Sequence, residues 1–179
     1  MFERRASSIA SILELLASRA PICHHTRAVK IRDFLHVIYD ALAKRLPKRY
    51  RAHDWRVRFG YLQVYFGDPA VHYEAWVQRR AGRIELGLHF EGEREANYRW
   101  AGVLGARSLE VQAQLGGDVE LEEWTESWTR LHETRRFTGA LSEELAQELA
   151  ARLCRFIEVM EPILAEERRA LSFRAQRGI

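Results

Sequence analysis

Histidine and glutamate side chains recur between apolar residues in the segment VHYEAWVQRRAGRIELGLHFE, residues 71–91. Imidazole and carboxylate groups that meet on a sheet can bind a metal ion or exchange a proton. The segment has no HExxH motif or other dedicated ligand spacing. The simpler interpretation is a solvated sheet face on which each His–Glu pair contributes roughly 0.2–1 kcal/mol. We therefore predict no metal and no cofactor, and interpret the polar side chains as a surface that contacts a partner. The candidate partner-binding residues are His72, Glu74, Trp76, His89 and Glu91.

The pairing of this segment follows from its alternation. Successive side chains of a strand point to opposite faces, so two alternating runs joined by a glycine-containing turn predict a hairpin. A loop over residues 80–83 pairs Val77 with Leu86, and apolar residues then face one another along the whole length. This register places Glu74 opposite His89 and His72 opposite Glu91. A slip by one residue would mix the two faces.

Basic residues gather in the segment KRLPKRYRAHDWRVR, residues 44–58, with Tyr50 and Trp55 among them. Cations interleaved with aromatic rings are typical of single-stranded nucleic-acid binding, in which charges contact phosphates and rings stack on bases. The alternative is a solvated connection whose two aromatic residues pack into the core. Cations at a helix C-terminus are also favourable without any ligand. The candidate nucleic-acid-binding residues are Lys44, Lys48, Arg49, Arg51, Arg56 and Arg58.

Five carboxylates lie between Asp118 and Glu126. We interpret this stretch as an edge strand kept soluble by its charges. A calcium site would require ligands that converge from a loop, and no EF-hand pattern is present.

The composition is that of a globular protein. Of the 179 residues 47% are hydrophobic and 30% are charged, and we predict a single domain over residues 1–179. Residues 1–65 carry 13 Lys and Arg against 5 Asp and Glu, whereas residues 66–179 carry 15 against 20. The two halves could attract each other within the fold or in a homodimer. Two distant cysteines predict a reducing cytoplasmic location, and no apolar run predicts membrane insertion.

The remaining pattern places helices around the strands. Helices are expected over residues 1–20, from Thr26 to Leu46, over residues 94–115 and from Ser142 to about Leu171, followed by a tail at 172–179 that is expected to fray. Strands are expected over residues 55–66, with a bulge at Gly60, over the two halves of 71–91, and over 118–124 and 127–133. The fold class is thus α+β, with an antiparallel sheet of about five strands packed by the N-terminal helices and the long C-terminal helix.

This order of elements over residues 27–171 resembles the α-β-β-β-α-β-β-α plan of type III secretion chaperones. That resemblance implies a dimer without catalytic activity that binds partner polypeptides, although those chaperones tend to be acidic and this chain is basic. Separately, GRIELGLHFEGEREANYRWAGVL followed by ELEEWTESWTRLHET looks like small uncharacterised bacterial domains, some of which accompany DNA restriction and repair systems.

No nucleophile elbow or other catalytic signature is present in the chain. We therefore expect a non-enzymatic interaction module that binds a protein partner or itself through an open sheet face. Nucleic-acid association through residues 44–58 is the first alternative. A metal-dependent enzyme with a His/Glu site on the 71–91 hairpin is the second.

Overall fold

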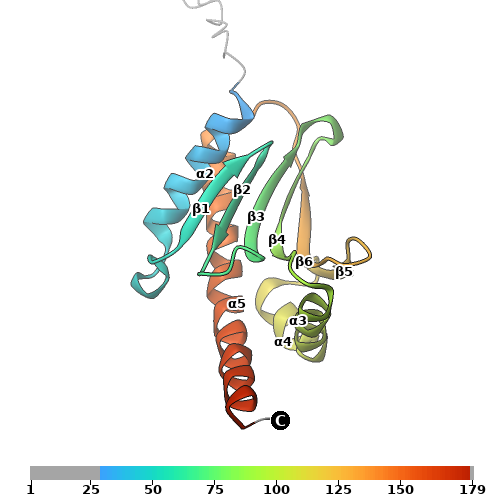
Figure 1. Ribbon diagram of the computed structural model, residues 1–179. Coiled ribbons are helices and arrows are strands. Elements are labelled where there is room, and N and C mark those ends of the chain that lie inside the picture. The colour runs from blue at the N-terminus through green and yellow to red at the C-terminus, as the bar shows by residue number, and fades with distance from the viewer. Residues whose placement is uncertain (1–28, 178–179) are drawn as a thin grey trace, which may run out of the picture.

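The computed structural model describes residues 29–177, which share one hydrophobic core (Figure 1). The helix expected over residues 1–20 lies outside this range. In chain order the elements are α2 (Ile31–Arg45), the 3-10 turn η1 (Lys48–Tyr50), β1 (Asp54–Arg58), β2 (Tyr61–Tyr65), β3 (Val71–Gln78), the 3-10 turn η2 (Arg79–Ala81), β4 (Arg83–Phe90), α3 (Arg94–Ala106), α4 (Ser108–Leu115), β5 (Glu120–Glu123), β6 (Thr129–Arg136) and α5 (Glu143–Arg177).

The six strands form one antiparallel sheet in the order β1-β2-β3-β4-β6-β5. Helices α2 and α5 pack against each other and cover one face of the sheet, and α3 and α4 lie beside α5 near one end of the strands (Figure 1). The apolar side chains of the central hairpin, among them Ala75, Leu86 and Leu88, are almost fully buried beneath the two helices. The predicted α+β class with an antiparallel sheet is confirmed, with one strand more than the five expected.

The additional strand arises at Phe59 and Gly60. The predicted bulge is wrong, because the chain reverses direction there and forms a hairpin between β1 and β2. Phe59 has φ 44° and Gly60 has φ 103°. A two-residue turn with positive φ at both residues has a backbone twist that matches the twist of the two strands it joins. Phenylalanine is an unusual residue at such a position, so the sequence carried no turn signal there.

The predicted register of the central hairpin is wrong by two residues. Val77 pairs with Ile84 and His72 pairs with His89, rather than with Leu86 and Glu91. The cause is the loop, in which the 3-10 turn η2 and Gly82, at φ 60°, reverse the chain earlier than expected. A slip of two residues preserves the faces, so the assignment of apolar and polar sides is confirmed.

The helices agree with the predicted pattern except in three places. The helix expected from Thr26 begins at Ile31, because Val29 and Lys30 are not helical. The helix expected over residues 94–115 is divided at Arg107 into α3 and α4. Helix α5 begins after Ser142, whose hydroxyl accepts a hydrogen bond from the backbone N–H of Leu145, and it continues past Pro162 to Arg177. Most of the tail expected to fray is therefore helical.

In the chain, the four strands β1 to β4 lie between α2 and α3. The secretion-chaperone plan has three strands at the corresponding place. Among residues 29–177, none of the helices has the length and apolar character needed to span a bilayer.

Candidate functional site

The strand register aligns polar side chains in rows across the sheet face that α2 and α5 do not cover. Residues directly opposite on neighbouring strands share a face, so each row contains one residue from each strand. One row reads Asp54, Tyr65, His72, His89, Arg130 and Glu122, and the next reads Arg56, Gln63, Glu74, Gly87, His132 and Glu120. We call this surface the polar face.

The middle of the polar face is buried. His72 and His89 are each 1% exposed and Glu85 is 2% exposed. The expectation of an open face at His72, Glu74 and His89 is therefore wrong, because side chains from both sheet edges cover them. The Trp124 ring, for example, lies edge-on to His89 with the ring centroids 5.8 Å apart.

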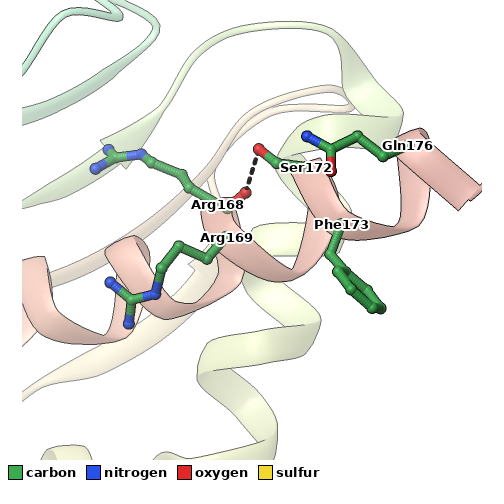
Figure 2. A pocket seen from close by; sticks show the side chains of 5 residues that line it. All are labelled: Arg168, Arg169, Ser172, Phe173 and Gln176. Carbon is green, nitrogen blue, oxygen red and sulfur yellow. Dashed lines mark hydrogen bonds between the residues drawn. The ribbon is translucent and has the colours of Figure 1, made fainter.

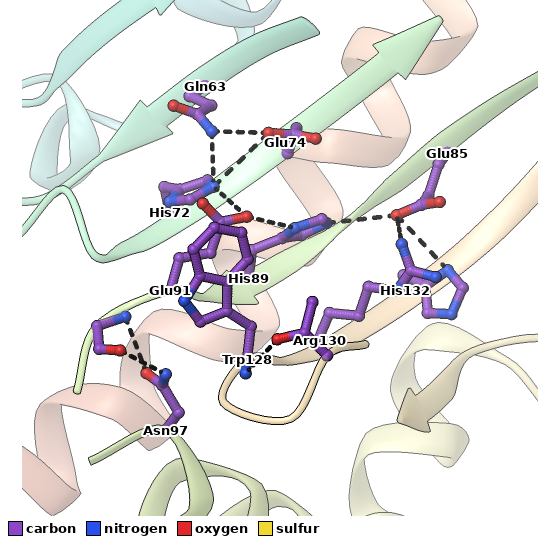
Figure 3. Close-up of polar contacts among 12 residues, drawn as sticks. Gln63, His72, Glu74, Glu85, His89, Glu91, Asn97, Trp128, Arg130 and His132 are labelled. Atoms are coloured by element: carbon purple, nitrogen blue, oxygen red, sulfur yellow. Dashed lines mark hydrogen bonds and ion pairs between the residues drawn. The ribbon is translucent and has the colours of Figure 1, made fainter. Parts of the chain in front are cut away.

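His72 is held by two hydrogen bonds, and Figure 3 shows the one that its Nε2 accepts from Gln63. Its Nδ1 lies 2.9 Å from the carbonyl oxygen of Pro69, which only accepts, so Nδ1 carries a proton. The Gln63 amide donates to His72 Nε2 at 2.8 Å and to Glu74 Oε2 at 2.7 Å, and its oxygen accepts from Arg56 Nε at 2.6 Å. The imidazole is thereby fixed as the tautomer whose Nε2 lone pair points along the face.

His89 lies between two carboxylates. Its Nε2 is 3.5 Å from Glu85 and its Nδ1 is 3.6 Å from Glu91, and within the described residues neither nitrogen makes a hydrogen bond of good geometry. Burial by itself would lower the pKa of His89, but Glu85 and Glu91, assisted by Glu74, raise that pKa to about 9. For Glu85 and Glu91, burial opposes ionisation but the nearby imidazolium prevails and lowers the pKa of each carboxyl. At neutral pH, His89 is a buried cation.

A second charged group adjoins His89 on the β6 side. Arg130 donates to Glu85 Oε1 at 2.5 Å and to Glu122 through Nε at 2.7 Å. His132 Nε2 lies 3.3 Å from the same Glu122 oxygen. Burial and the neighbouring Arg130 lower the pKa of His132. Two histidines one row apart are thus held in different charge states at neutral pH.

Three half-buried tryptophans border this network. Trp124 lies between Trp76 and Trp128, with ring centroids 6.1 and 5.8 Å apart, and the guanidinium of Arg130 lies 4.9 Å from the centre of the Trp124 ring. The turn between β5 and β6 also forms a hollow of about 440 Å³, lined by Thr125, Glu126, Ser127 and Trp128. We call the three tryptophans the tryptophan cluster.

The candidate nucleic-acid-binding residues come from two parts of the fold. Lys44, Lys48, Arg49 and Arg51 lie at the end of α2 and around η1, whereas Arg56 and Arg58 lie on β1. Several are used within the chain: Arg51 donates to the carbonyl of Leu46, and Arg56 donates to Gln63. Trp55 stacks on Tyr39 with the centroids 3.8 Å apart. Nucleic-acid binding by this segment stays a prediction.

A second hollow, of about 360 Å³, lies on the last turns of α5. It is lined by Arg168, Arg169, Ser172, Phe173 and Gln176, and the Ser172 hydroxyl donates to the carbonyl of Arg168 (Figure 2). The Ser172 hydroxyl thus has its hydrogen-bond acceptor within the helix itself. The Arg168 guanidinium also donates a hydrogen bond to Glu161 at 3.2 Å.

Sequence reasoning missed half of the polar network. Gln63, Glu85, Arg130 and His132 were not among the candidates, although each occupies an alternating position of a predicted strand. Counting every polar residue on that face of each strand, rather than on the central hairpin alone, would have found them.

Two groups of described residues bring three potential metal ligands together: His72, His89 and Glu91, and Glu120, Glu122 and His132. In each group the ligand atoms lie within 4.8 Å of one another.

Comparison of the chain with protein-family models, with curated proteins and with solved structures found no match.

Proposed function

We propose that this protein is a non-enzymatic interaction module that binds a polypeptide segment rich in arginine or lysine. The observation that carries the proposal is the tryptophan cluster, Trp76, Trp124 and Trp128, on the accessible side of the polar face. Tryptophan is enriched among the residues that dominate binding energy at protein interfaces.

The charges around the tryptophan cluster favour a cationic partner. Glu120, Glu123 and Glu126 are exposed on β5 and on the turn that follows it, and Glu126 lines the 440 Å³ hollow together with Trp128. An indole face attracts a guanidinium or ammonium group by about 0.5–1 kcal/mol at an exposed site. Arg130 already occupies such a position over Trp124. Carboxylates beside indole rings therefore provide both charge and stacking for an arginine side chain.

The partner segment can belong to a second copy of this chain or to another protein. The basic segment 44–58 of a second copy has the required chemistry, with seven Lys and Arg, Tyr50 and Trp55. Such an interface would depend on the salt concentration, because exposed charges are screened within about 10 Å at 0.1 M salt.

The test is a titration of the protein with a short oligo-arginine peptide and with an oligo-glutamate peptide of equal length, followed by tryptophan fluorescence. Sedimentation of the protein alone at micromolar concentration, at low and high salt, is measured in parallel. We expect saturable binding of the arginine peptide that weakens with salt and is reduced in Trp128→Ala and Glu126→Gln. The control is Glu143→Gln, which removes an exposed carboxylate at the start of α5, outside the tryptophan cluster and the basic segment.

The results of these measurements distinguish a partner segment from a second copy of this chain from one that belongs to another protein. Salt-sensitive self-association that is lost in Trp128→Ala identifies a second copy as the partner. A monomer that binds the arginine peptide indicates a different protein. A monomer that binds neither peptide, or equal binding by wild type and Trp128→Ala, would overturn the proposal.

A further inference from the structure

The polar face contains a buried group of nitrogen and oxygen atoms whose arrangement the interaction proposal does not use. We propose that His72, His89 and Glu91 form a binding site for one divalent transition-metal ion, and that Zn²⁺ fits it best. This inference is independent of the tryptophan cluster and of any partner.

The geometry is close to that of a metal site. His72 and His89 are directly opposite on β3 and β4, with stacked rings whose centroids are 5.5 Å apart, and Glu91 follows the end of β4. Glu91 Oε1 lies 3.9 Å from His72 Nε2 and 3.6 Å from His89 Nδ1. Tetrahedral zinc at ~2.0–2.1 Å from its ligands sets neighbouring ligand atoms about 3.3 Å apart. Glu91 lies beyond the end of the strand and is half-buried, so it can supply the contraction of a few tenths of an ångström toward each imidazole. The three ligand atoms lie within 4.8 Å of one another, and the two imidazoles must also turn toward each other to bind one ion.

The two imidazoles are oriented as ligands. The bond from His72 Nδ1 to the Pro69 carbonyl leaves Nε2 as the ring nitrogen with a lone pair, and this atom lies 3.9 Å from Glu91 Oε1. On His89, Nδ1 faces Glu91 while Nε2 faces Glu85, so metal binding at Nδ1 leaves the N–H at Nε2 for that carboxylate. Backbone carbonyls and carboxylates that hold the second ring nitrogen are the usual supports of metal-binding histidines.

The buried ring nitrogens of His89 are the second observation that points to a ligand. The side chain is 1% exposed, and among the described residues neither nitrogen has a hydrogen-bond partner. A buried polar group without a hydrogen bond is costly, so its presence requires an explanation. A bound cation would satisfy Nδ1 and would replace the proton that His89 otherwise carries. Glu74 Oε2, 3.6 Å from His72 Nε2, supplies further negative charge or a fourth ligand.

The set of donor atoms selects the metal. Two imidazoles with one or two carboxylates suit Zn²⁺ and related transition metals, whereas Mg²⁺ and Ca²⁺ prefer oxygen ligands alone. Binding requires the Gln63 amide to release His72 Nε2, and Gln63 then retains its bond to Glu74. The other group, Glu120, Glu122 and His132, is a poorer candidate because Glu122 is paired with the Arg130 guanidinium, whose charge repels a cation.

The test is zinc binding by the full-length protein without an affinity tag, treated with a chelator, exchanged into metal-free buffer and titrated at mildly alkaline pH. We expect uptake of an equimolar amount of Zn²⁺, a rise in the melting temperature, and visible absorption bands of tetrahedral geometry with Co²⁺. Glu91→Gln and His72→Asn should lose binding, and Glu85→Gln should weaken it about 10–100-fold. His132→Asn is the matched control and should bind as the wild type does.

Circular dichroism establishes that each variant folds. Glu91→Gln is the most informative, because the substitution preserves shape at a half-buried position. Absence of equimolar binding of both Zn²⁺ and Co²⁺ to the wild type would overturn the inference. Undiminished binding by Glu91→Gln and His72→Asn, or loss of binding in His132→Asn, would overturn it as well.

Discussion

At His89 the sheet buries an imidazole between two carboxylates, and in the metal-free protein this arrangement makes stability depend on pH. The pKa of the imidazole is raised from 6.5 to about 9 in the folded chain. A histidine whose folded pKa is raised contributes stability that is fully present below its unfolded pKa and is lost as the pH rises through the folded value. This rise in the pKa corresponds to a contribution of about 3 kcal/mol to the free energy of unfolding, because a shift of one pKa unit is worth 1.36 kcal/mol.

We predict that the free energy of unfolding of the metal-free protein falls between pH 6.5 and about 9. The expected loss is about 2–3 kcal/mol, and it should be absent in His89→Asn, which has no proton to release over this range. Urea denaturation in chelating buffer at several pH values measures it. The lowered pKa values of Glu85 and Glu91 describe the same contacts, and their contribution is lost at acidic pH instead. A flat profile for the wild type over this alkaline range would contradict the prediction.

Alternation predicted the face of each residue in the central hairpin, but it could not predict burial on the polar side. Glu74 and His89 were expected in solvent, and they are 5% and 1% exposed. The side chains that surround them come partly from residues 122–132, which join the sheet beside β4 through a connection of two helices. Local periodicity contains no information about which distant strand becomes a neighbour, so the contacts within the network were not predictable, although its members occupy alternating positions of predicted strands.

Among the elements, β4 and β6 are in tight contact at Gly87. A Cβ atom at this position would lie 2.5 Å from the carbonyl oxygen of Leu131 and 2.7 Å from the Cβ atom of His132. Those contacts involve backbone and Cβ atoms, which cannot rotate away. Gly87 therefore permits the pairing that carries Arg130 to Glu85. On α3, by contrast, Gly102 has open space around it.

We predict opposite effects for two glycine-to-alanine substitutions. Gly87→Ala should destabilise the protein by about 1–3 kcal/mol, because the two strands must separate to admit the methyl group. Gly102→Ala should stabilise it by about 0.5–1 kcal/mol, because alanine is favoured over glycine inside a helix. Chemical denaturation of both variants measures the two changes. A neutral Gly87→Ala would show that the strands are not in tight contact.

The errors in the prediction of the strands were errors in turns. Phe59 and Gly60 form a hairpin turn without the Asn-Gly or Asp-Gly pair that usually indicates one. The η2 turn places the loop of the central hairpin at residues 79–82 instead of 80–83, which shifts the register by two residues. Strands and helices with clear periodicity were predicted well, because their pattern extends over many residues. A turn depends on the φ values of two or three residues, and no pattern repeated along the sequence indicates those values.

For the whole molecule, the long helix α5 divides into a buried part and a projecting part. Residues from Ala146 to Leu164 supply much of the core, whereas residues 172–177 are exposed and extend past the sheet (Figure 1). Between these parts, Arg168 donates to Glu161, a buried carboxylate that also accepts a hydrogen bond from Tyr73 at 2.9 Å. The part of α5 that contributes to stability therefore ends near Arg168.

We predict that deletion of residues 172–179 changes the free energy of unfolding by no more than about 0.5 kcal/mol, since no buried contact of the described residues is lost. Deletion from Arg168 onward should cost about 1–2 kcal/mol, because Glu161 loses a charged hydrogen-bond donor. Thermal and urea unfolding of the two shortened chains provide the comparison. Equal stability of the two would show that the Arg168–Glu161 contact contributes nothing.

Because α2 packs on α5, the buried side chains of α2 are covered only after α5 has been synthesised. Phe34, Leu35 and Ile38 of α2 are at most 1% exposed, and the helix they contact is made last among the described elements. Until α5 leaves the ribosome, both the apolar stripe of α2 and the apolar face of the sheet lack their cover. Contacts between segments so far apart also slow folding, because a long loop must close before they form. The nascent chain therefore passes through an interval in which it is exposed to aggregation and suited to chaperone binding.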